Sequence, residues 1–262
     1  MPNAPFQNNV VILTGASQGI GEQLAYQLAG QGAKLVLAAR NAEKLEAVAA
    51  GCHERGAEAV AVQTDVTDEA QCKRLIERAL AEYGRIDTLL NNAGKGWPGR
   101  FENLRQVSHL HDEMNLNYFG LVYCVHYALP HLRQTRGRIV GVGSFGGLVG
   151  LPGTIGYNSS KHAMRGFLNT LRAELTGTGV TVTLVFPGAI SGEALEATMG
   201  ENARRVPTMT SERCAELILR AGAKRQRQHI LTVEGKMLFW LSLLIPGILD
   251  RQLNRLSSLY RQ

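Results

Sequence analysis

The chain has 262 residues, of which 45% are apolar, and this is enough to bury one substantial core, so we expect a single α/β domain. Its formal charge of +6 favours an anionic partner, but no basic run interleaved with aromatic residues is present, which argues against nucleic acid. The four cysteines and seven histidines lack disulfide or metal-ligand spacing, so we expect reduced thiols, no metal site and a cytoplasmic protein without a secretory signal or spanning helix.

The first predicted strand, Val10–Thr14, is short, apolar and β-branched, as expected of a strand buried on both faces. A helix is predicted after it, and the spacing G-x-x-x-G-x-G lies between the two at Gly15, Gly19 and Gly21. Glycines allow a tight turn and close approach to a pyrophosphate, and a helix N-terminus offers free amides and partial positive charge. A dinucleotide cofactor is therefore predicted at this turn.

The second predicted strand, residues 34–40, ends where a dinucleotide-binding fold meets the adenosine ribose. An acidic residue there would bind the ribose 2′-hydroxyl and repel a 2′-phosphate, but this chain has Ala39 and Arg40. We therefore expect NADP(H), with Arg40 as a phosphate ligand rather than a surface arginine at the start of a loop. The third strand, residues 59–63, is followed by Asp65, which is placed to accept from the adenine amino group.

Further strands alternate with helices along the chain. Strands are predicted at residues 86–90, 138–142, 181–186 and 229–233, and helices at residues 41–55, 69–83 and 109–132. This alternation predicts a doubly wound parallel sheet of about seven strands, with helices on both faces and the ligand at the carboxyl ends of the strands.

The fourth strand is followed by Asn91–Gly94, a tight polar turn that lets the backbone pass close to a ribose or nicotinamide. Asn117 lies within a predicted helix, where a local kink would free a backbone carbonyl for water.

The stretch Gly141–Lys161 carries the polar side chains Ser144, Tyr157 and Lys161. Residues after Asn158 are predicted to be helical, so Tyr157 and Lys161, four residues apart, would share one helix face. A phenol has a pKa of about 10 and exchanges protons poorly near neutrality unless a neighbouring cation favours the phenolate. An isolated pair of this kind is usually a plain helix surface pair, so its interpretation as acid–base machinery depends on the motifs around it.

Taken together, the motifs resemble the classical short-chain dehydrogenase/reductase family over about residues 8–190. In chain order they are TGASQGIG at 14–21, Asp65, NNAG at 91–94, Asn117 in N-x-x-G, Ser144, YNSSK at 157–161, and Pro187-Gly188. The resemblance implies a Rossmann-type fold. It also implies that these cofactor-binding residues hold NADP(H): Gly15, Ser17, Gln18, Gly19, Ile20, Gly21, Arg40, Asp65, Val66, Asn92, Ala93, Gly94, Tyr157, Lys161, Pro187, Gly188 and Ile190.

The same resemblance implies roles for four catalytic residues. Tyr157 would be the general acid in carbonyl reduction and the base in alcohol oxidation. Lys161 would lower the pKa of Tyr157 and hold the nicotinamide ribose. Ser144 would hydrogen-bond the substrate oxygen, and Asn117 would position a water that links Lys161 to solvent.

Two departures from the family pattern concern the cofactor. Members that prefer NADP often carry a second basic residue in the glycine-rich turn, where this chain has Gln18, so the predicted preference depends mainly on Arg40, with Ser17 as a helper. A threonine that binds the nicotinamide side often follows the Pro-Gly pair. Gly192 stands at its position, and Ser191 is the candidate substitute.

Substrate recognition is predicted in residues 188–207, which would form a lid as in the family, or otherwise a surface helix. Its Leu195 and Met199, together with Trp97 and Phe145, are the candidate substrate contacts. The two aromatic residues have an alternative interpretation as core or interface packing.

The domain is predicted to span residues 1–235, and residues 236–262 form an extension beyond the point where many members end. Within it, residues 237–249 (MLFWLSLLIPGIL) are apolar nearly all round and bordered by basic residues, but too short to span a bilayer. Contact with a membrane interface, packing across a dimer and covering of the substrate entrance remain as alternatives. Extensions of this kind resemble those of reductases acting on steroid-like or long-chain lipid carbonyls, so a hydrophobic substrate is expected.

The sequence therefore predicts an NADP(H)-dependent oxidoreductase that interconverts a ketone and a secondary alcohol. We expect a homodimer or homotetramer in the cytoplasm, with peripheral membrane association through residues 237–249 as one alternative. A 3-oxoacyl thioester reductase is the second choice, and the apolar extension argues against it. A non-catalytic dinucleotide-binding regulatory protein is the third, and it would not need the full set of four catalytic residues.

Overall fold

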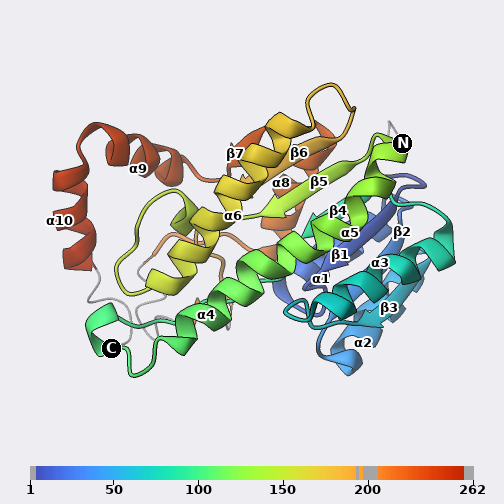
Figure 1. Cartoon of the computed structure of the whole chain (residues 1–262), viewed down its shortest axis with the longest axis horizontal. Helices are drawn as coiled ribbons and strands as arrows, with labels where there is room; N and C mark the ends of the chain where they lie inside the picture. Colours follow the sequence, from blue (N-terminus) through green and yellow to red (C-terminus); the bar gives the residue numbers. More distant parts are fainter. Residues whose placement is uncertain (1–3, 193–194, 197–205, 257–262) are drawn as a thin grey trace.

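The computed structural model describes residues 4–192, 195–196 and 206–256, and the chain forms a sheet with helices on both faces (Figure 1). Within the described residues, seven parallel strands pair in the order β3-β2-β1-β4-β5-β6-β7, so the predicted doubly wound sheet is confirmed. The strands are β1 (Val10–Thr14), β2 (Lys34–Ala39), β3 (Ala59–Gln63), β4 (Thr88–Asn91), β5 (Arg138–Val142), β6 (Thr181–Phe186) and β7 (Gln228–Ile230).

Two layers of helices enclose the sheet. One face packs against α1 (Gly19–Ala29), α2 (Ala42–His53) and α8 (Ser211–Ala223), and the other against α3 (Glu69–Tyr83), α5 (Gly120–Thr135) and α6 (Ile155–Glu174). The short helix α4 (Ser108–Met114) precedes α5, and α9 (Val233–Leu244) and α10 (Pro246–Leu256) lie at the end of the molecule opposite β3 (Figure 1).

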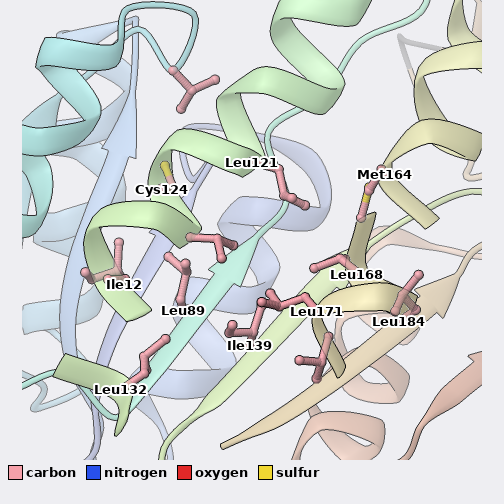
Figure 2. Packing of buried hydrophobic residues seen from close by; sticks show 14 of the residues in the cluster. Ile12, Leu89, Leu121, Cys124, Leu132, Ile139, Met164, Leu168, Leu171 and Leu184 are labelled. Atoms are coloured by element: carbon pink, nitrogen blue, oxygen red, sulfur yellow. The ribbon is translucent and has the colours of Figure 1, made fainter. Parts of the chain in front are cut away.

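Alternate residues of β1 reach opposite cores, because successive side chains of a strand point to opposite faces. Ile12 packs with Leu89, Leu121 and other residues under α3, α5 and α6, as Figure 2 shows. Its neighbour Leu13 belongs to the core under α1, α2 and α8. Fully apolar strands are thus explained by burial on both faces.

The order of the strands indicates a ligand crevice at the carboxyl ends of the central strands. The chain moves outward from β1 to β2 and β3, then returns to pair β4 on the other side of β1. In open sheets of this type, ligands bind beyond the carboxyl ends of the strands at such a switch point. Here the turns that follow β1 and β4 lie at that point.

Several predicted boundaries were wrong. The helix expected over residues 109–132 is divided: α4 ends at Met114, a π-helical turn η2 spans Asn115–Phe119, and α5 follows. The change of helix type lies where a local kink was predicted. The strand expected at 229–233 ends at Ile230, because the Thr232 hydroxyl accepts from the Gly235 amide at 3.0 Å and caps α9. The helix of Tyr157 begins at Ile155, ahead of the predicted start after Asn158.

The C-terminal extension packs on the body of the protein through one side. Leu249 and Leu253 are buried in the same core cluster as α5 and α6, and Leu238, Phe239 and Leu241 are partly buried against it. The α9 residues Val233, Met237, Trp240 and Leu244 are exposed instead, at 76, 56, 60 and 73%. No helix in the described part of the chain has both the length and the apolar character needed to cross a membrane.

Candidate active site

The glycine-rich turn after β1 has the geometry that only glycine tolerates. Gly15 and Gly19 have φ of +66° and +59°, in the left-handed region. A Cβ at Gly15 would lie 2.8 Å from Ala93 Cα, and one at Gly21 would meet the carbonyl oxygen of Gly15. The turn therefore passes directly into α1 and presents the backbone amides of its first turn, as the sequence predicts for a pyrophosphate site.

The polar turn after β4 is bonded to the glycine-rich turn. The amides of Asn92 and Ala93 both donate to the Thr14 hydroxyl at 3.1 Å, and Asn92 Nδ2 donates to the Gly15 carbonyl at 3.1 Å. A Cβ at Gly94 would lie 2.8 Å from Asn117 Oδ1 and 3.0 Å from Lys161 Nζ. The same short turn thus contacts the phosphate side of the site at one end and the catalytic residues at the other.

A basic group stands at the end of β2. Arg40 is exposed directly after the strand, and its carbonyl accepts from Gln63 Nε2 at 3.0 Å, which fixes the backbone there. Lys44, in the first turn of α2, reaches back so that its Nζ lies 3.5 Å from Gln18 Oε1. The sequence analysis missed Lys44, because its contact with Gln18 is tertiary and no spacing in the sequence indicates it. Its side chain places a second cation next to Gln18.

The residues after β3 form the adenine side of the predicted site. Asp65 Oδ1 accepts from the amide and hydroxyl of Thr67 at 3.0 and 2.8 Å, and the Asp65 amide donates to Gln71 Oε1 at 2.9 Å. Val66 is buried, and a Cβ at Gly120 would lie 2.7 Å from its Cγ2. These bonds hold the loop at the carboxyl end of β3, next to β2.

Ser144 follows β5 and caps the short 3-10 helix η3 (Phe145–Gly147), its Oγ accepting from the Gly146 amide at 3.2 Å. Glycines are required in this turn because α6 packs directly on it. A Cβ at Gly147 would lie 3.0 Å from the Lys161 carbonyl oxygen, and one at Gly146 would meet the side chain of Asn158. This close packing brings Ser144 next to the first turns of α6.

Tyr157 and Lys161 lie on one face of α6, as predicted. Lys161 Nζ is 5.7 Å from the centroid of the Tyr157 ring and donates to the Val142 carbonyl at 3.1 Å. Burial lowers the pKa of the Lys161 ammonium to about 8. Burial raises the pKa of the Tyr157 phenol, the Ser144 hydroxyl opposes this rise, and the charge of Glu113 adds to it. In the chain alone, the protonated form of Tyr157 is therefore favoured, whereas the sequence analysis expected Lys161 to lower the pKa of the phenol.

Asn117 sits in the π-helical turn η2, 1% exposed, and connects three parts of the site. Its Oδ1 accepts from the Lys95 amide at 2.9 Å, and its Nδ2 donates to the Lys95 carbonyl and to Ser160 Oγ, both at 2.9 Å. Ser160 in turn donates to the Tyr157 carbonyl at 2.8 Å. The sequence analysis missed Ser160, which the helical spacing from Tyr157 could have indicated.

Glu113 is a second residue that the sequence analysis missed. It is 2% exposed at the end of α4, and its Oε1 accepts from the Trp97 amide at 2.9 Å. No periodic signal marked it, because a glutamate in a polar helical stretch normally faces solvent.

The segment after β6 closes the nicotinamide side of the predicted site. The Pro187 carbonyl accepts from the Phe145 amide at 2.9 Å, which joins this segment to the turn of Ser144. Ile190 pairs with Met209 in a short parallel bridge, and the Ser191 amide donates to the Met209 carbonyl at 3.0 Å. Gly192 has φ of +132°, a conformation that the threonine common at this position would rarely adopt.

The predicted substrate contacts are only partly within the described residues. Trp97 is 40% exposed, with Lys95 Nζ 5.3 Å from its ring centroid. Phe145 is half-buried, and its Cδ2 would lie 3.6 Å from a Cβ at Gly235 in α9, so the extension borders the turn of Ser144. Leu195 is half-buried, whereas Met199 and most of the predicted lid over residues 188–207 fall outside the described residues.

The site as a whole fits a dinucleotide. The cradle that Gly15 and Gly21 keep free of side chains suits a pyrophosphate, two cations stand beyond β2, and a buried ammonium adjoins the turn after β4. The described residues hold no cluster of histidine, cysteine or acidic side chains suited to a metal ion.

Comparison with known proteins agrees with this geometry. A family model described as short chain dehydrogenase matches residues 9–203. A protein named 11-beta-hydroxysteroid dehydrogenase-like 4A from Arabidopsis thaliana is 39% identical over 246 residues, which cover 92% of this chain and 82% of that protein. The 11-beta-hydroxysteroid dehydrogenase of Pinus massoniana is 36% identical over 259 residues (93% and 72%), and 11-beta-hydroxysteroid dehydrogenase A of Sesamum indicum is 33% identical over 255 residues (92% and 73%). The chain therefore belongs to the short-chain dehydrogenase/reductase family of oxidoreductases, which use the nicotinamide cofactors NAD or NADP.

Proposed function

We propose that this protein is an NADP(H)-dependent oxidoreductase that interconverts a ketone and a secondary alcohol on a hydrophobic, steroid- or lipid-like substrate. The observation that carries the proposal is the convergence of Ser144, Tyr157 and Lys161 from β5 and α6, with Asn117 linking α6 to the turn after β4. A protein that only bound a dinucleotide would not require this acid–base set.

The four residues divide the work on the substrate oxygen, while the bound cofactor supplies or accepts the hydride. Ser144 Oγ accepts from the Gly146 amide, and in the proposed complex its hydroxyl proton is donated to the substrate carbonyl oxygen. Tyr157 donates its phenolic proton to the oxygen as negative charge develops there. The raised pKa of Tyr157 keeps that proton in place at neutral pH, which favours carbonyl reduction.

Lys161 and Asn117 would restore the proton. Burial lowers the pKa of Lys161 only to about 8, so its ammonium is mostly charged at neutral pH and can favour the phenolate left after proton transfer. The Asn117 side chain is fully engaged with Lys95 and Ser160, and the π-helical turn around it departs from the regular carbonyl ladder. Such a turn supports the proposed water that connects Lys161 to solvent.

The preference for NADP(H) is supported by the charges beyond β2. Arg40 and Lys44 are both exposed there, and no acidic side chain follows the strand before Glu43. A 2′-phosphate would meet two cations, whereas the ribose 2′-hydroxyl of NAD would find no carboxylate directly after the strand.

A hydrophobic substrate is supported by the residues that border Ser144 and Tyr157. Trp97 and Phe145 flank these residues, and α9 closes the side beyond Phe145. Leu195, which is half-buried, lies within the predicted lid. The relatives named as 11-beta-hydroxysteroid dehydrogenases support a steroid-like ring system in particular.

Peripheral membrane contact is part of the proposal and is supported by the exposed side of α9. Val233, Met237, Trp240 and Leu244 follow the spacing of one helix face and are all more than half exposed, while Lys236 beside them is also exposed. An apolar face with tryptophan next to basic residues suits the interface of an anionic membrane. The four free, buried cysteines suit a reducing compartment such as the cytoplasm.

Self-association is also proposed, through α5. Phe119, the last residue of η2 directly before α5, is 38% exposed and stacks on Tyr123 with ring centroids 6.1 Å apart. This is an apolar surface of the kind that oligomers bury. Sedimentation of the protein and of Phe119→Ser tests this. A dimer or tetramer that weakens in the variant supports it, and a monomeric protein contradicts it.

A substrate panel tests the proposed function. Oxidation of NADPH and of NADH should be followed with a steroid ketone, a long-chain ketone, a short aliphatic ketone and a 3-oxoacyl thioester. We expect the steroid or long-chain ketone to give the highest kcat/KM with NADPH. Preference for the thioester would favour the alternative reductase, and cofactor binding without turnover of any compound would favour a regulatory protein.

A further inference from the structure

Glu113 is a buried charged side chain that the proposed mechanism leaves without a role. Among the described residues, only Asp87 and Lys161 share this combination of charge and burial. Asp87 is neutralised by Arg85 at 2.6 Å, whereas no lysine or arginine in the described part of the chain forms an ion pair with Glu113. A buried carboxylate without a cation is costly unless hydrogen bonds compensate for the lost water, so its contacts indicate what it holds in place.

The two carboxylate oxygens of Glu113 face two different parts of the active site. Oε1 accepts from the amide of Trp97, in the loop after β4. Oε2 occupies the space that a side chain at Gly156 would fill, directly before Tyr157, with the carboxyl carbon 2.9 Å from that Cβ position. Glu113 thus joins the loop to the first turn of α6.

The loop held by Glu113 lies on the ring of Tyr157. A Cβ at Gly96 would be 3.0 Å from Tyr157 Cγ and Cδ2, so the backbone next to Trp97 covers the phenol in van der Waals contact. Because the ring has this loop on one side and the turn of Ser144 near its hydroxyl, the position of the loop helps to set the direction of the hydroxyl.

We propose that Glu113 is a positioning residue for Tyr157: it clamps the Gly96–Trp97 backbone against the phenol ring and places a negative charge beside the group that transfers the proton. This inference rests on the proposed function of Tyr157 as the acid–base residue. It assigns to α4 a part in the chemistry that the four catalytic residues alone do not supply.

The sign of the charge effect follows from the groups around the phenol. Burial is the largest effect on the pKa of Tyr157 and raises it, the hydrogen bond from Ser144, which caps η3, lowers it, and the charge of Glu113 from α4 raises it. The Lys161 ammonium from α6 lies 5.7 Å from the centroid of the ring. Burial is the largest effect on the pKa of Glu113 and raises it, while the hydrogen bond from the Trp97 amide and the charge of His109, one turn earlier on α4, lower it. An ionised Glu113 keeps Tyr157 protonated to higher pH, which favours reduction of a ketone over oxidation of an alcohol.

Three variants of the full chain separate the charge of Glu113 from its contacts. Glu113→Gln keeps an acceptor for the Trp97 amide and removes the charge, and Glu113→Ala removes both. Asp112→Asn makes the same charge change at an exposed neighbour on α4 and is the matched control. Each is measured for kcat and KM against pH in both directions, and by absorbance titration of tyrosinate, from which the same variant carrying Tyr157→Phe is subtracted.

We expect Glu113→Gln to move the titration of Tyr157, and the alkaline fall in ketone reduction, to lower pH, with KM changed less than about twofold, since no substrate contact is lost. Glu113→Ala should in addition lower kcat about tenfold or more, because a misplaced proton donor is a poor catalyst. Asp112→Asn should match the unmodified protein.

Two results would overturn the proposal: a Glu113→Gln protein whose Tyr157 titrates as in the unmodified chain, or an equal shift in Asp112→Asn. If no compound is turned over, the proposed function fails, but the tyrosinate titration still decides on Glu113. Since Glu113→Gln preserves the shape of the buried side chain, the test does not depend on the folding of Glu113→Ala.

Discussion

Replacing Arg40 by aspartate should reverse the preference between the two nicotinamide cofactors. The side chain is exposed after β2, so a phosphate contact there is screened by water and contributes about 1.4 kcal/mol, near the lower end of the range for charge-assisted hydrogen bonds. Loss of this contact corresponds to about tenfold in kcat/KM for NADPH. The new carboxylate adds repulsion of similar size, so Arg40→Asp should lose roughly a hundredfold with NADPH.

The same carboxylate can accept from a ribose 2′-hydroxyl, so kcat/KM for NADH should stay constant or rise. The assay is steady-state ketone reduction with each cofactor, and Arg133→Asp is the control, since it makes the same charge change at the end of α5, near the start of β5. Lys44→Ala should add a loss of about two- to fivefold with NADPH only. A ratio of NADPH to NADH efficiency that is unchanged in Arg40→Asp would refute the assigned phosphate site.

Three further predictions concern the glycine-rich turn, the buried lysine and the extension. Gly15→Ala places a Cβ 2.8 Å from Ala93 Cα at a φ of +66°. It should destabilise the fold by about 1–3 kcal/mol, measured by thermal unfolding, and abolish cofactor binding, measured by NADPH fluorescence. Binding like that of the unmodified chain would contradict the steric argument. The pKa of Lys161 in the folded chain is about 8, below the 10.5 of a free lysine, so burial of its charge costs stability below pH 8 and this cost is relieved as the pH rises to about 10.5. In urea unfolding, the free energy of unfolding of the unmodified chain should therefore rise by about 3 kcal/mol relative to Lys161→Met between these pH values. A constant difference between the two proteins would refute the shift. Met237→Ser combined with Trp240→Ser should reduce flotation with anionic liposomes at least severalfold. The melting temperature should stay within a few degrees, since both side chains are more than half exposed. Flotation equal to that of the unmodified chain would exclude α9 as the membrane contact.

Much of the fold followed from local patterns because the parallel strands are buried on both faces. Runs such as VVILT at Val10–Thr14 have no polar side to obscure them, and helical segments separate them regularly. The ends of elements were harder to place, because they depend on single side-chain bonds. The Thr232 cap that starts α9 and the π-helical turn around Asn117 are examples that periodicity alone does not reveal.

The catalytic residues could be named from the sequence because Ser144 follows a strand, Tyr157 and Lys161 share a helix face, and Asn117 lies in a motif that resembles the family. Glu113 and Lys44 could not, since their roles come from tertiary contacts: one carboxylate reaches the Trp97 amide across a loop, and one ammonium folds back to Gln18. The sequence analysis expected Lys161 to lower the pKa of Tyr157, whereas burial is the largest effect in the chain alone and raises it.

The most direct test of the account is the Tyr157→Phe variant assayed beside the unmodified protein with NADPH and the best ketone of the panel. The change removes one hydroxyl and keeps the ring against Gly96, so NADPH should still bind, as measured by fluorescence titration. The account predicts a fall in kcat of about 10²- to 10⁴-fold, the range for loss of a general acid. Equal rates in the two proteins would contradict it, because proton transfer would then not depend on Tyr157.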